Sequence, residues 1–426
     1  MTKVISISTD RNIFKENSAV QARQIEYGAL FDELHIVVFT KLTSFLPSKI
    51  QIAPNVWAYG THSLSKLLHI SQAVKIAERI IAENKKSGEF TPESSVITVQ
   101  DPFETGLVGS KLKKKFGLPL HIQIHTDFLN PYFAKQSLLN KFRVKMAKKL
   151  LPQADAIRVV SRRIADNLSE LSGISLNPGA ATETLKPKAV PESQTSRIVS
   201  PTILPIFVDI KKIKDAPVTV DLKNKYPQFN FIILMASRLT NEKNISFAIK
   251  VFEKLVSVYP KIGLVVAGSG PEGKKLVSLA KRLKIAKNVI FEPWQDNLSS
   301  YYKTANLFLL TSNYEGYGLT LVEAVASRCP VVSTDVGAAS ELLRDEKNRE
   351  VSGVPSVSSI SSVCPVGDTA CFFNKISAFI ENPGIREHSI HEAYARLGKV
   401  VIFDKSEYLK KYQKSVESAK KEIKTR

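Results

Sequence analysis

The chain has 426 residues, more than one ordinary hydrophobic core accommodates, so its length predicts two domains. Its hydrophobic content is 43%, its mean hydropathy of -0.06 is typical of a soluble protein, and no apolar run approaches the roughly 18 residues that span a bilayer. The net charge of +20 calls for an anionic partner, but the basic clusters lack interleaved aromatic residues, so nucleic acid is the least favoured one.

The N-terminal half alternates short apolar runs with helical patterns. The first run is too short for the core of a secretion signal and reads as a strand instead. Helices are expected over 19–30 and 71–83. The expected strands are Val4–Ser8, Leu34–Phe39, Val96–Val99 and Leu120–Ile124. This alternation predicts a doubly wound parallel sheet, whose ligands bind beyond the carboxyl ends of the strands.

Polar residues follow two of these strands. Asp101 comes after Val96–Val99, and His125 and Asp127 come after Leu120–Ile124. The position puts all three at the edge of the sheet where ligands bind. A lone histidine at a strand end is commonly a structural residue, so the pattern alone leaves both interpretations open.

A basic stretch continues from there. Residues 105–151 carry ten basic side chains and one acid, Asp127. Within it, lysines occupy one helical face and apolar residues another. The apolar stripe is Leu139, Phe142, Met146 and Leu150, and the lysines are Lys141, Lys145 and Lys148. Such a helix either lies on an anionic membrane surface or packs on the core with a solvated lysine face.

A new strand at 231–234 opens the second domain. Arg238 and Lys243 follow it, just before a helix that is expected from about Asn244. Fixed cations at a strand end can hold a diphosphate through charge-assisted hydrogen bonds and stabilise its charge as it leaves.

The segment Gly268–Gly273 satisfies G-x-G-x-x-G after the expected strand Leu264–Ala267. This pattern raises the alternative of a dinucleotide-dependent oxidoreductase. The signal is weak, because the fingerprint belongs to the first strand–helix unit of a dinucleotide-binding half. Trp294, after the strand Val289–Phe291, is a candidate wall for a nucleotide base.

The most informative stretch is Tyr314–Ala324, after the buried strand Leu307–Leu310. It passes through two glycines into a helical pattern, and the first N–H groups of a helix favour a phosphate. Glu315 and Glu323 border this place, and carboxylates accept hydrogen bonds from sugar hydroxyls. The stretch therefore suits a nucleotide sugar, with a tight turn and a capping glutamate as the alternative.

Glu315 and Glu323, with Gly316, Gly318 and Leu319 between them, resemble the E-x7-E motif of retaining glycosyltransferases of family 4. Three further segments are similar to motifs of that family in the same order. They are Ala236–Leu239 with Glu242–Asn244, Val266–Pro271, and Cys329–Gly337 with Ser340-Glu341. The match is dense from about 231 to 345. The chain departs from the family at Asn17-Ser18, where a Gly-Gly loop is usual, and at Arg328, where glycine is usual.

The resemblance implies an α/β protein of the GT-B fold, with two Rossmann-like doubly wound domains facing across a cleft. It implies transfer of a sugar from a UDP-, GDP- or ADP-sugar to a hydroxyl acceptor, either a glycan or lipid-linked, with retention of configuration. No cofactor or metal is expected, and the chain contains no D-x-D motif. The expected catalytic residues are His125, Glu315, Arg238 and Lys243. The expected donor-binding residues are Gly316, Tyr317, Gly318, Leu319, Thr320, Glu323, Gly268 and Trp294; Asp127 and Asp101 are expected on the acceptor side.

The expected domains are 1–209 on the acceptor side, a linker at 210–228, the nucleotide-sugar domain 229–385, and a helical segment 386–426 that crosses back. The three cysteines, too few for a disulfide framework, predict reduced thiols and a cytoplasmic protein. The basic helix adds an anionic membrane surface as a partner, which would place the protein at the inner face of the membrane. A dinucleotide oxidoreductase, a phosphorylase of the same fold and a non-catalytic sugar-nucleotide binder remain as alternatives.

Overall fold

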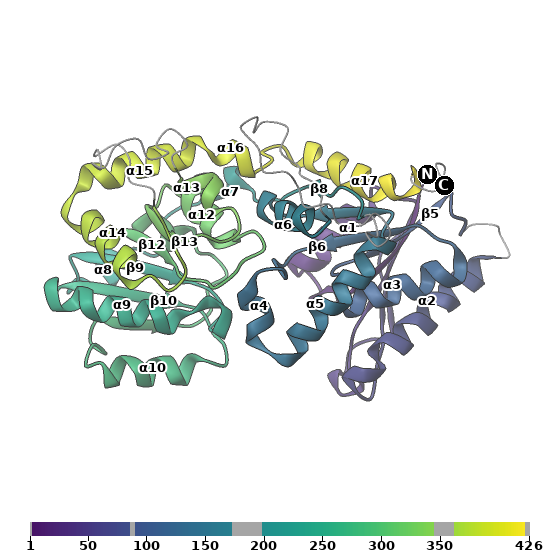
Figure 1. The fold of residues 1–426 in the computed structure, drawn as a ribbon, viewed down its shortest axis with the longest axis horizontal. Coiled ribbons are helices and arrows are strands. Elements are labelled where there is room, and N and C mark those ends of the chain that lie inside the picture. Colours follow the sequence, from purple (N-terminus) through teal and green to yellow (C-terminus); the bar gives the residue numbers. More distant parts are fainter. Residues whose placement is uncertain (1, 86–89, 173–197, 345–361, 422–426) are drawn as a thin grey trace, which may run out of the picture. The chain divides into compact units, whose positions relative to one another are not determined.

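The computed structural model describes residues 2–85, 90–172, 198–344 and 362–421, which fold as two compact units (Figure 1). The first unit comprises residues 1–204 and 406–426, and the second comprises residues 205–405. Each unit is built around one predominantly parallel sheet with helices packed on it.

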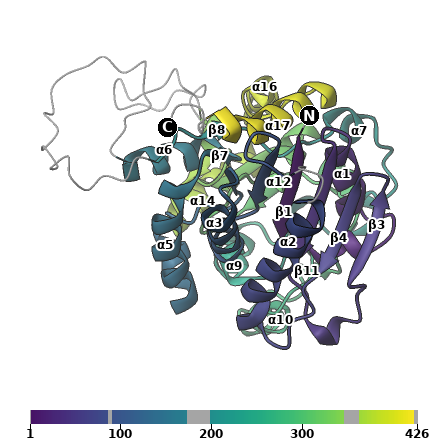
Figure 2. The same cartoon turned by 90° about the vertical axis from the view of Figure 1, so that its right-hand side faces the viewer.

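The sheet of the first unit has the strand order β3-β4-β2-β1-β5-β6-β7-β8. Its pairs are parallel except for the antiparallel pair of β3 with β4, at one edge of the sheet (Figure 2). The strands are β1 (Lys3–Ser8), β2 (Glu33–Val38), β3 (Lys49–Ala53), β4 (Val56–Gly60), β5 (Ser95–Val99), β6 (Leu120–Ile124), β7 (Ala156–Val159) and β8 (Thr202–Ile203). The four strands expected from the sequence are confirmed, and the order reverses between β1 and β5.

Short polar side chains start the helices of this unit. The hydroxyl of Ser18 accepts a hydrogen bond from the Gln21 N–H and begins α1, and that of Ser137 accepts from Asn140 and begins α5. The helices are α1 (Ala19–Gly28), α2 (His69–Lys85), α3 (Glu104–Phe116), α4 (Pro131–Gln136), α5 (Leu138–Leu150), α6 (Arg162–Ser172) and α17 (Lys405–Lys421).

The last of these helices packs on the N-terminal sheet. The buried Arg158 of β7 donates from Nη2 to the Tyr408 hydroxyl at 3.1 Å and lies over the ring of Tyr412. His121 of β6 contacts the Ser415 hydroxyl at 3.2 Å. The first unit is therefore assembled from the two ends of the chain.

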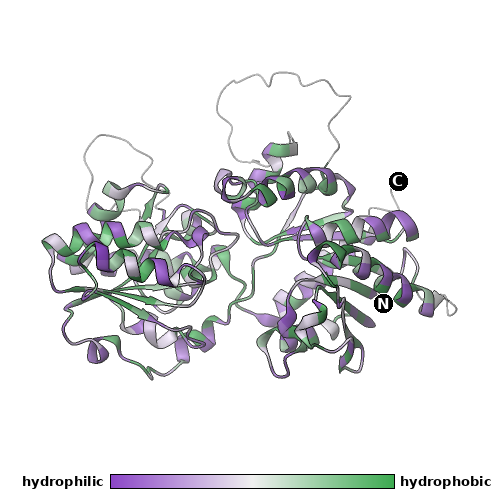
Figure 3. Cartoon of the chain, turned by 90° about the horizontal axis from the view of Figure 1, so that it is seen from below, coloured by the Kyte–Doolittle hydropathy of each residue, from purple (hydrophilic) through white to green (hydrophobic). Residues whose placement is uncertain are grey.

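The second sheet has the order β11-β10-β9-β12-β13-β14, and all its pairs are parallel. The strands are β9 (Phe231–Ala236), β10 (Ile262–Ala267), β11 (Val289–Glu292), β12 (Leu307–Leu310), β13 (Val331–Thr334) and β14 (Val363–Cys364). These strands are mostly hydrophobic and buried, whereas polar residues line the outer faces of the helices (Figure 3). The strands expected in this half are confirmed.

The helices of the second unit extend beyond the expected domain limits. They are α7 (Ile210–Asp215), α8 (Leu222–Lys225), α9 (Ile245–Val258), α10 (Gly273–Arg282), α11 (Ser299–Thr304), α12 (Leu319–Ala326), α13 (Ala339–Leu343), α14 (Thr369–Glu381), α15 (Pro383–Ala395) and α16 (Leu397–Val400). Residues 210–228 are part of this unit rather than a linker, because Ile210 and Leu222 are buried in it. Residues 386–405 also belong to it, because Leu397 and Val400 are buried there, so only the final helix joins the first unit.

The expectation of three reduced cysteines is wrong. Cys364 of β14 and Cys371 in the first turn of α14 form a disulfide, with their Cα atoms 5.8 Å apart. The bond arises because the chain reverses between the strand and the helix and returns the two residues to each other. Cys329 is a buried free thiol.

Candidate donor site and acceptor-side residues

The order of the second sheet reverses between β9 and β12, and two loops meet at their carboxyl ends. The backbone N–H of Asn313 donates to the Glu242 carbonyl at 2.8 Å, and the Asn244 amide donates to the Asn313 side chain at 3.0 Å. The Thr311 hydroxyl donates to the carbonyl of Lys243 at 3.1 Å. Such a reversal is where open α/β sheets bind ligands, and here the loops are fixed to each other.

Lys243 and Glu315 form an ion pair at this junction. Nζ of Lys243 lies 2.5 Å from Oε1 of Glu315, and the same oxygen accepts from the Ser312 hydroxyl at 2.7 Å. Both charged side chains are about one-seventh exposed, at 15% and 13%. They are therefore shielded from bulk water and still reachable by a ligand.

Arg238 extends from the same loop into solvent, with 66% of its side chain exposed. Its Nη2 lies 3.3 Å from Oε1 of Glu242, which also accepts from the Thr240 hydroxyl at 2.6 Å. Burial would raise the pKa of Glu242, but the hydrogen bonds and the charges of Arg238 and Lys243 lower it overall. The loop thus has two cations, of which Arg238 is the more exposed.

Gly318 shapes the entry into α12. It has φ of +87°, a left-handed conformation in which glycine avoids the strain of a side chain. No side chain caps the first turn, Leu319 is 39% exposed, and Thr320 is half-buried. The buried Gly316 lies one residue after Glu315. The start of α12 is consequently presented at the strand edge beside the ion pair.

Glu323 lies on α12 and contacts α11. Its Oε2 accepts from the hydroxyl of Tyr302, a buried residue, at 3.2 Å. Burial raises the pKa of Glu323, and this hydrogen bond opposes the rise. Its carboxylate therefore has a protein partner that the sequence did not reveal.

Two of the expected donor-binding residues have structural contacts instead of open surfaces. The side chain of Tyr317 is 3% exposed, and its hydroxyl donates to the Val400 carbonyl at 2.5 Å. The N–H of Gly268 donates to the Glu292 carbonyl at 3.0 Å, and a Cβ on Gly268 would lie 1.9 Å from the Ser237 carbonyl oxygen. Gly268 thus lets two loops pack closely. Trp294 is 55% exposed, and its Nε1 donates to Asp296 at 3.2 Å.

Arg328 occupies the turn after α12, where the family usually has glycine. Its φ is +56°, so the turn retains the left-handed conformation that favours glycine. The guanidinium lies 4.2 Å from the ring centroid of Tyr394, a cation–π contact. Asn17, at the other departure, also has a positive φ, of +58°. Both substitutions therefore preserve a backbone shape that glycine would adopt.

His125 and the two aspartates expected on the acceptor side lie in the first unit, after the carboxyl ends of the adjacent strands β5 and β6. Burial lowers the pKa of His125 to about 3, and the charges of Arg158 and Arg23 act in the same direction. His125 is thus a neutral imidazole at physiological pH. The order of the sheet brings the loops of Asp101 and His125 to one edge.

The carboxylates of Asp101 and Asp127 accept hydrogen bonds from other parts of the first unit. Asp101 accepts from the Phe103 N–H at 2.8 Å, and burial raises its pKa to about 6. Asp127 is 2% exposed and accepts from the Asn167 amide at 2.9 Å, while burial raises its pKa as well. The contacts of Asp127 are structural, whereas Asp101 is the more open of the two.

The basic helix α5 places its expected apolar stripe partly in solvent. Leu150 is buried, but Leu139 and Phe142 are 53% and 59% exposed, and Leu138 is 81% exposed. The lysines of the helix are exposed as well. In the described part of the chain, no helix combines the length and apolar character needed to cross a bilayer.

Sequence reasoning missed a cluster around Glu292, at the end of β11. Its carboxylate accepts from Tyr226 at 2.5 Å, from Tyr301 at 2.6 Å and from Lys225 at 2.7 Å. Burial would raise the pKa of Glu292, but these three donors lower it. The only sequence signal was an acid at the end of an apolar run. Across the described ranges, no group of three or more potential metal ligands was found.

Part of the second unit matches a known protein family. Residues 222–396, which contain both loops, match the family described as Glycosyl transferases group 1. The poly(glycerol-phosphate) alpha-glucosyltransferase of Bacillus subtilis is 33% identical over 123 residues, 29% of this chain and 18% of that protein. The alpha-monoglucosyldiacylglycerol synthase of Streptococcus pneumoniae is 26% identical over 262 residues, 59% of this chain and 54% of that protein. The chain thus spans less than two thirds of either relative.

Solved structures match over nearly the whole chain. Sucrose-phosphate synthase from Thermosynechococcus elongatus aligns with a TM-score of 0.69 at 18% identity, covering 97% of this chain and 98% of that one. Anabaena HepE in complex with UDP-glucose aligns with a TM-score of 0.66 at 17% identity, covering 98% and 100%. The chain therefore has the GT-B fold with two Rossmann-like domains, and the expected fold class is confirmed.

Proposed function

We propose that this protein is a retaining glycosyltransferase of family 4 that moves a hexose from a nucleoside diphosphate sugar to a hydroxyl acceptor. The observation that carries the proposal is the ion pair of Lys243 with Glu315 at the reversal of the second sheet. It lies in the segment that matches the glycosyltransferase group 1 family. HepE, a structural neighbour, has been solved with UDP-glucose, which makes a UDP-sugar the first donor to test.

In the proposed reaction, the bond between the anomeric carbon and the diphosphate oxygen breaks, and the acceptor hydroxyl forms a bond to that carbon on the same face. The proton of the hydroxyl passes to the leaving phosphate oxygen. Lys243 and Arg238 stabilise the charge of the departing diphosphate, together with the first N–H groups of α12. Glu315 accepts hydrogen bonds from donor hydroxyls and fixes the ammonium group of Lys243.

His125 would contribute from the first unit as a neutral hydrogen-bonding group. Its lowered pKa favours the neutral imidazole at physiological pH. Asp101, which loses its proton near pH 6, would contact acceptor hydroxyls. Glu323 would bind ribose hydroxyls through the carboxylate that Tyr302 orients.

The oxidoreductase alternative is disfavoured by the packing of the glycine loop. In a dinucleotide site these glycines let the backbone approach the pyrophosphate. Here the space above Gly268 is filled by the Ser237 carbonyl, and its N–H donates to Glu292. A non-catalytic binder differs from a transferase only in turnover.

A ligand screen with a turnover measurement separates these possibilities. UDP, GDP, ADP, their hexose conjugates and NAD would be compared by thermal shift, followed by assays for release of the nucleoside diphosphate. A ligand at 100 times its Kd stabilises the folded state by about 2.7 kcal/mol. We expect one nucleotide series to raise the Tm and its sugar conjugate to be turned over. Stabilisation by NAD alone, or binding without turnover, would contradict the proposal.

We also propose that the first unit docks on an anionic membrane and takes a lipid-linked acceptor. Helix α5 combines exposed Leu138, Leu139 and Phe142 with exposed lysines. Each lysine near an anionic surface contributes on the order of 1 kcal/mol, and buried apolar side chains add to this. The Streptococcus relative, which matches 59% of this chain, is named for a glucosyldiacylglycerol, a lipid product.

A second exposed apolar cluster supports lipid contact. Leu42, Phe45, Leu64 and Leu67 are 53–95% exposed, on the loops that follow β2 and β4. The loops are joined by hydrogen bonds from the Leu42 N–H to the Ser63 carbonyl and back from Ser63 to Thr40, at 3.1 and 2.9 Å. Residues 34–77 contain no acid. Such a cluster suits insertion between anionic headgroups.

Vesicle flotation tests this docking. The wild-type protein should bind vesicles rich in phosphatidylglycerol, and the bound fraction should fall steeply as the salt concentration rises. It should not bind phosphatidylcholine vesicles. Phe142→Ser and the double variant Lys141→Gln/Lys145→Gln should bind at least tenfold more weakly. The variant Lys111→Gln/Lys114→Gln on α3 is the charge-matched control. If wild type does not bind at low salt, the acceptor is not presented by a membrane.

A further inference from the structure

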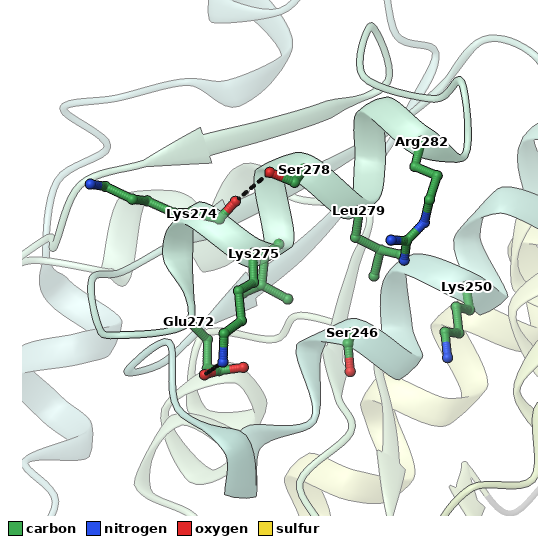
Figure 4. A pocket seen from close by; sticks show the side chains of 9 residues that line it. Ser246, Lys250, Glu272, Lys274, Lys275, Ser278, Leu279 and Arg282 are labelled. Atoms are coloured by element: carbon green, nitrogen blue, oxygen red, sulfur yellow. Dashed lines mark hydrogen bonds and ion pairs between the residues drawn. The ribbon is translucent and has the colours of Figure 1, made fainter.

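Helices α9 and α10 of the second unit border a cavity of about 510 Å³ that the proposed reaction does not use. Figure 4 shows the side chains of both helices around this cavity; Lys275 points toward Glu272, whereas the ammonium group of Lys274 extends away from the other labelled side chains. The lining includes four cations and one acid, Glu272. The cations are Lys250, Lys274, Lys275 and Arg282. None of the expected site residues lines this cavity.

The cations lie at two ends of the cavity. Lys274 and Lys275 are in the first turn of α10, and Arg282 is in its last turn, with Lys250 opposite on α9. Arg282 lies seven positions after Lys275, which corresponds to about 10 Å along the helix. The hydroxyls of Ser246 and Ser278 lie between these ends, over a floor of buried Leu276 and Leu279.

The protein alone leaves these charges poorly compensated. Lys274 and Lys275 stand at the positive end of the α10 dipole, where cations are unfavourable, and the first turn contains no acid. Glu272 pairs with Lys275 at 2.9 Å. The remaining cations of the cavity have no acidic residue beside them in its lining. A ligand with separated negative charges would compensate both ends.

We propose that this cavity binds a linear chain of phosphate groups, such as a phosphodiester polymer or a polyphosphate. Phosphate oxygens accept from lysine and arginine donors together; of the two serines, Ser278 already donates to the Lys274 carbonyl at 3.0 Å, so Ser246 is the additional donor. The spacing of the two ends requires more than one phosphate. A bilayer surface is a poorer occupant, because the apolar residues of the cavity are buried on its floor rather than exposed. The proposal does not rest on the glycosyltransferase activity.

Isothermal titration of the full chain with inorganic tripolyphosphate tests the site. The variant Lys250→Gln/Arg282→Gln removes the two positive charges at one end of the cavity. The control Lys254→Gln/Lys281→Gln removes two positive charges from the same helices at positions that do not line the cavity. We expect at least tenfold weaker binding for the first and less than twofold for the second. Any binding at the donor site contributes equally to both variants. Equal weakening of the two would overturn the proposal.

Further ligands identify the chemistry. Tripolyphosphate and oligo(glycerol phosphate) should compete with each other, and orthophosphate should bind at least tenfold more weakly. If orthophosphate binds as tightly as tripolyphosphate, the ligand is not a linear chain of phosphates. The proposal is also contradicted if Lys250→Gln/Arg282→Gln loses binding to anionic vesicles but keeps its binding to tripolyphosphate. The nucleotide thermal shift should be unchanged in this variant, which also verifies that it is folded.

Discussion

The Nζ atom of Lys243 lies 2.5 Å from Oε1 of Glu315, although 72 positions separate the two residues. Each follows a different strand, and the reversal of strand order between β9 and β12 brings them together. The sequence suggested a phosphate role for Lys243 and a sugar role for Glu315. In the proposed reaction, this pairing would hold the ammonium group in place before a donor binds and so reduce the reorganisation required.

The left-handed turn at Arg328 predicts that a glycine variant is more stable than an alanine variant at this position. Within a helix glycine is less stabilising than alanine, but at φ of +56°, just past the end of α12, it avoids a cost of roughly 1–2 kcal/mol. Both substitutions lose the contact with Tyr394. Arg328→Gly should therefore be about 1 kcal/mol more stable than Arg328→Ala in urea unfolding. If the alanine variant is the more stable, the turn does not have this conformation in solution.

The raised pKa of Asp101 predicts a pH-dependent stability. The folded state retains the proton up to about pH 6, whereas an unfolded aspartate loses it near 3.9. Stability should therefore fall between about pH 4 and pH 6 from this group and remain constant above. Asp101→Asn should be more stable than wild type above pH 6, by up to about 3 kcal/mol, with the difference vanishing below pH 4.

Unfolding of both proteins across pH 3.5–8 checks this prediction. The matched control is Asp296→Asn, the same substitution at an exposed residue. A constant difference between Asp101→Asn and wild type at all pH values would mean that burial does not perturb this carboxyl.

The regular elements could be predicted because their signal is local. Apolar runs such as Leu120–Ile124 and Leu307–Leu310 are strands in the structure, and the polar residues after them lie at the carboxyl edge. What could not be predicted depends on contacts between distant segments. The hydroxyl of Tyr317 donates to Val400, and Tyr302 donates to Glu323. No periodicity reports such partners.

The corrections have the same origin. The three cysteines of the chain suggested no disulfide, but the turn between β14 and α14 brings Cys364 and Cys371 together and they form one. Residues 210–228 looked like a linker because of their lysines, while Leu222 packs in the second unit. The lysine content of such a segment indicates that most of it is exposed, but it does not show which apolar residue is buried and holds the segment in the unit.

The disulfide between Cys364 and Cys371 predicts how many thiols react in the denatured protein before and after reduction. Protein denatured without reductant should show one reactive thiol, that of Cys329, and three after reduction. A colorimetric thiol titration measures both numbers, with a Cys329→Ser variant expected to give none and then two. Three thiols before reduction would show that the pair is reduced in the isolated protein.

The proposed charge stabilisation predicts turnover without a divalent metal. Lys243, Arg238 and the start of α12 are expected to supply the positive potential at the diphosphate. Activity measured after dialysis against EDTA should remain within twofold of the untreated protein. Loss of activity that magnesium or manganese restores would contradict this electrostatic account.

The central claim is that the pair of Lys243 and Glu315 binds and activates a nucleotide sugar. The most direct measurement compares kcat/KM for the donor found in the screen among wild type, Glu315→Ala and Glu253→Ala, a control on α9. One lost hydrogen bond to a charged group costs roughly 1.5–3 kcal/mol, so we predict a loss of about 10- to 150-fold for Glu315→Ala alone. Full activity in a folded Glu315→Ala variant would contradict the claim.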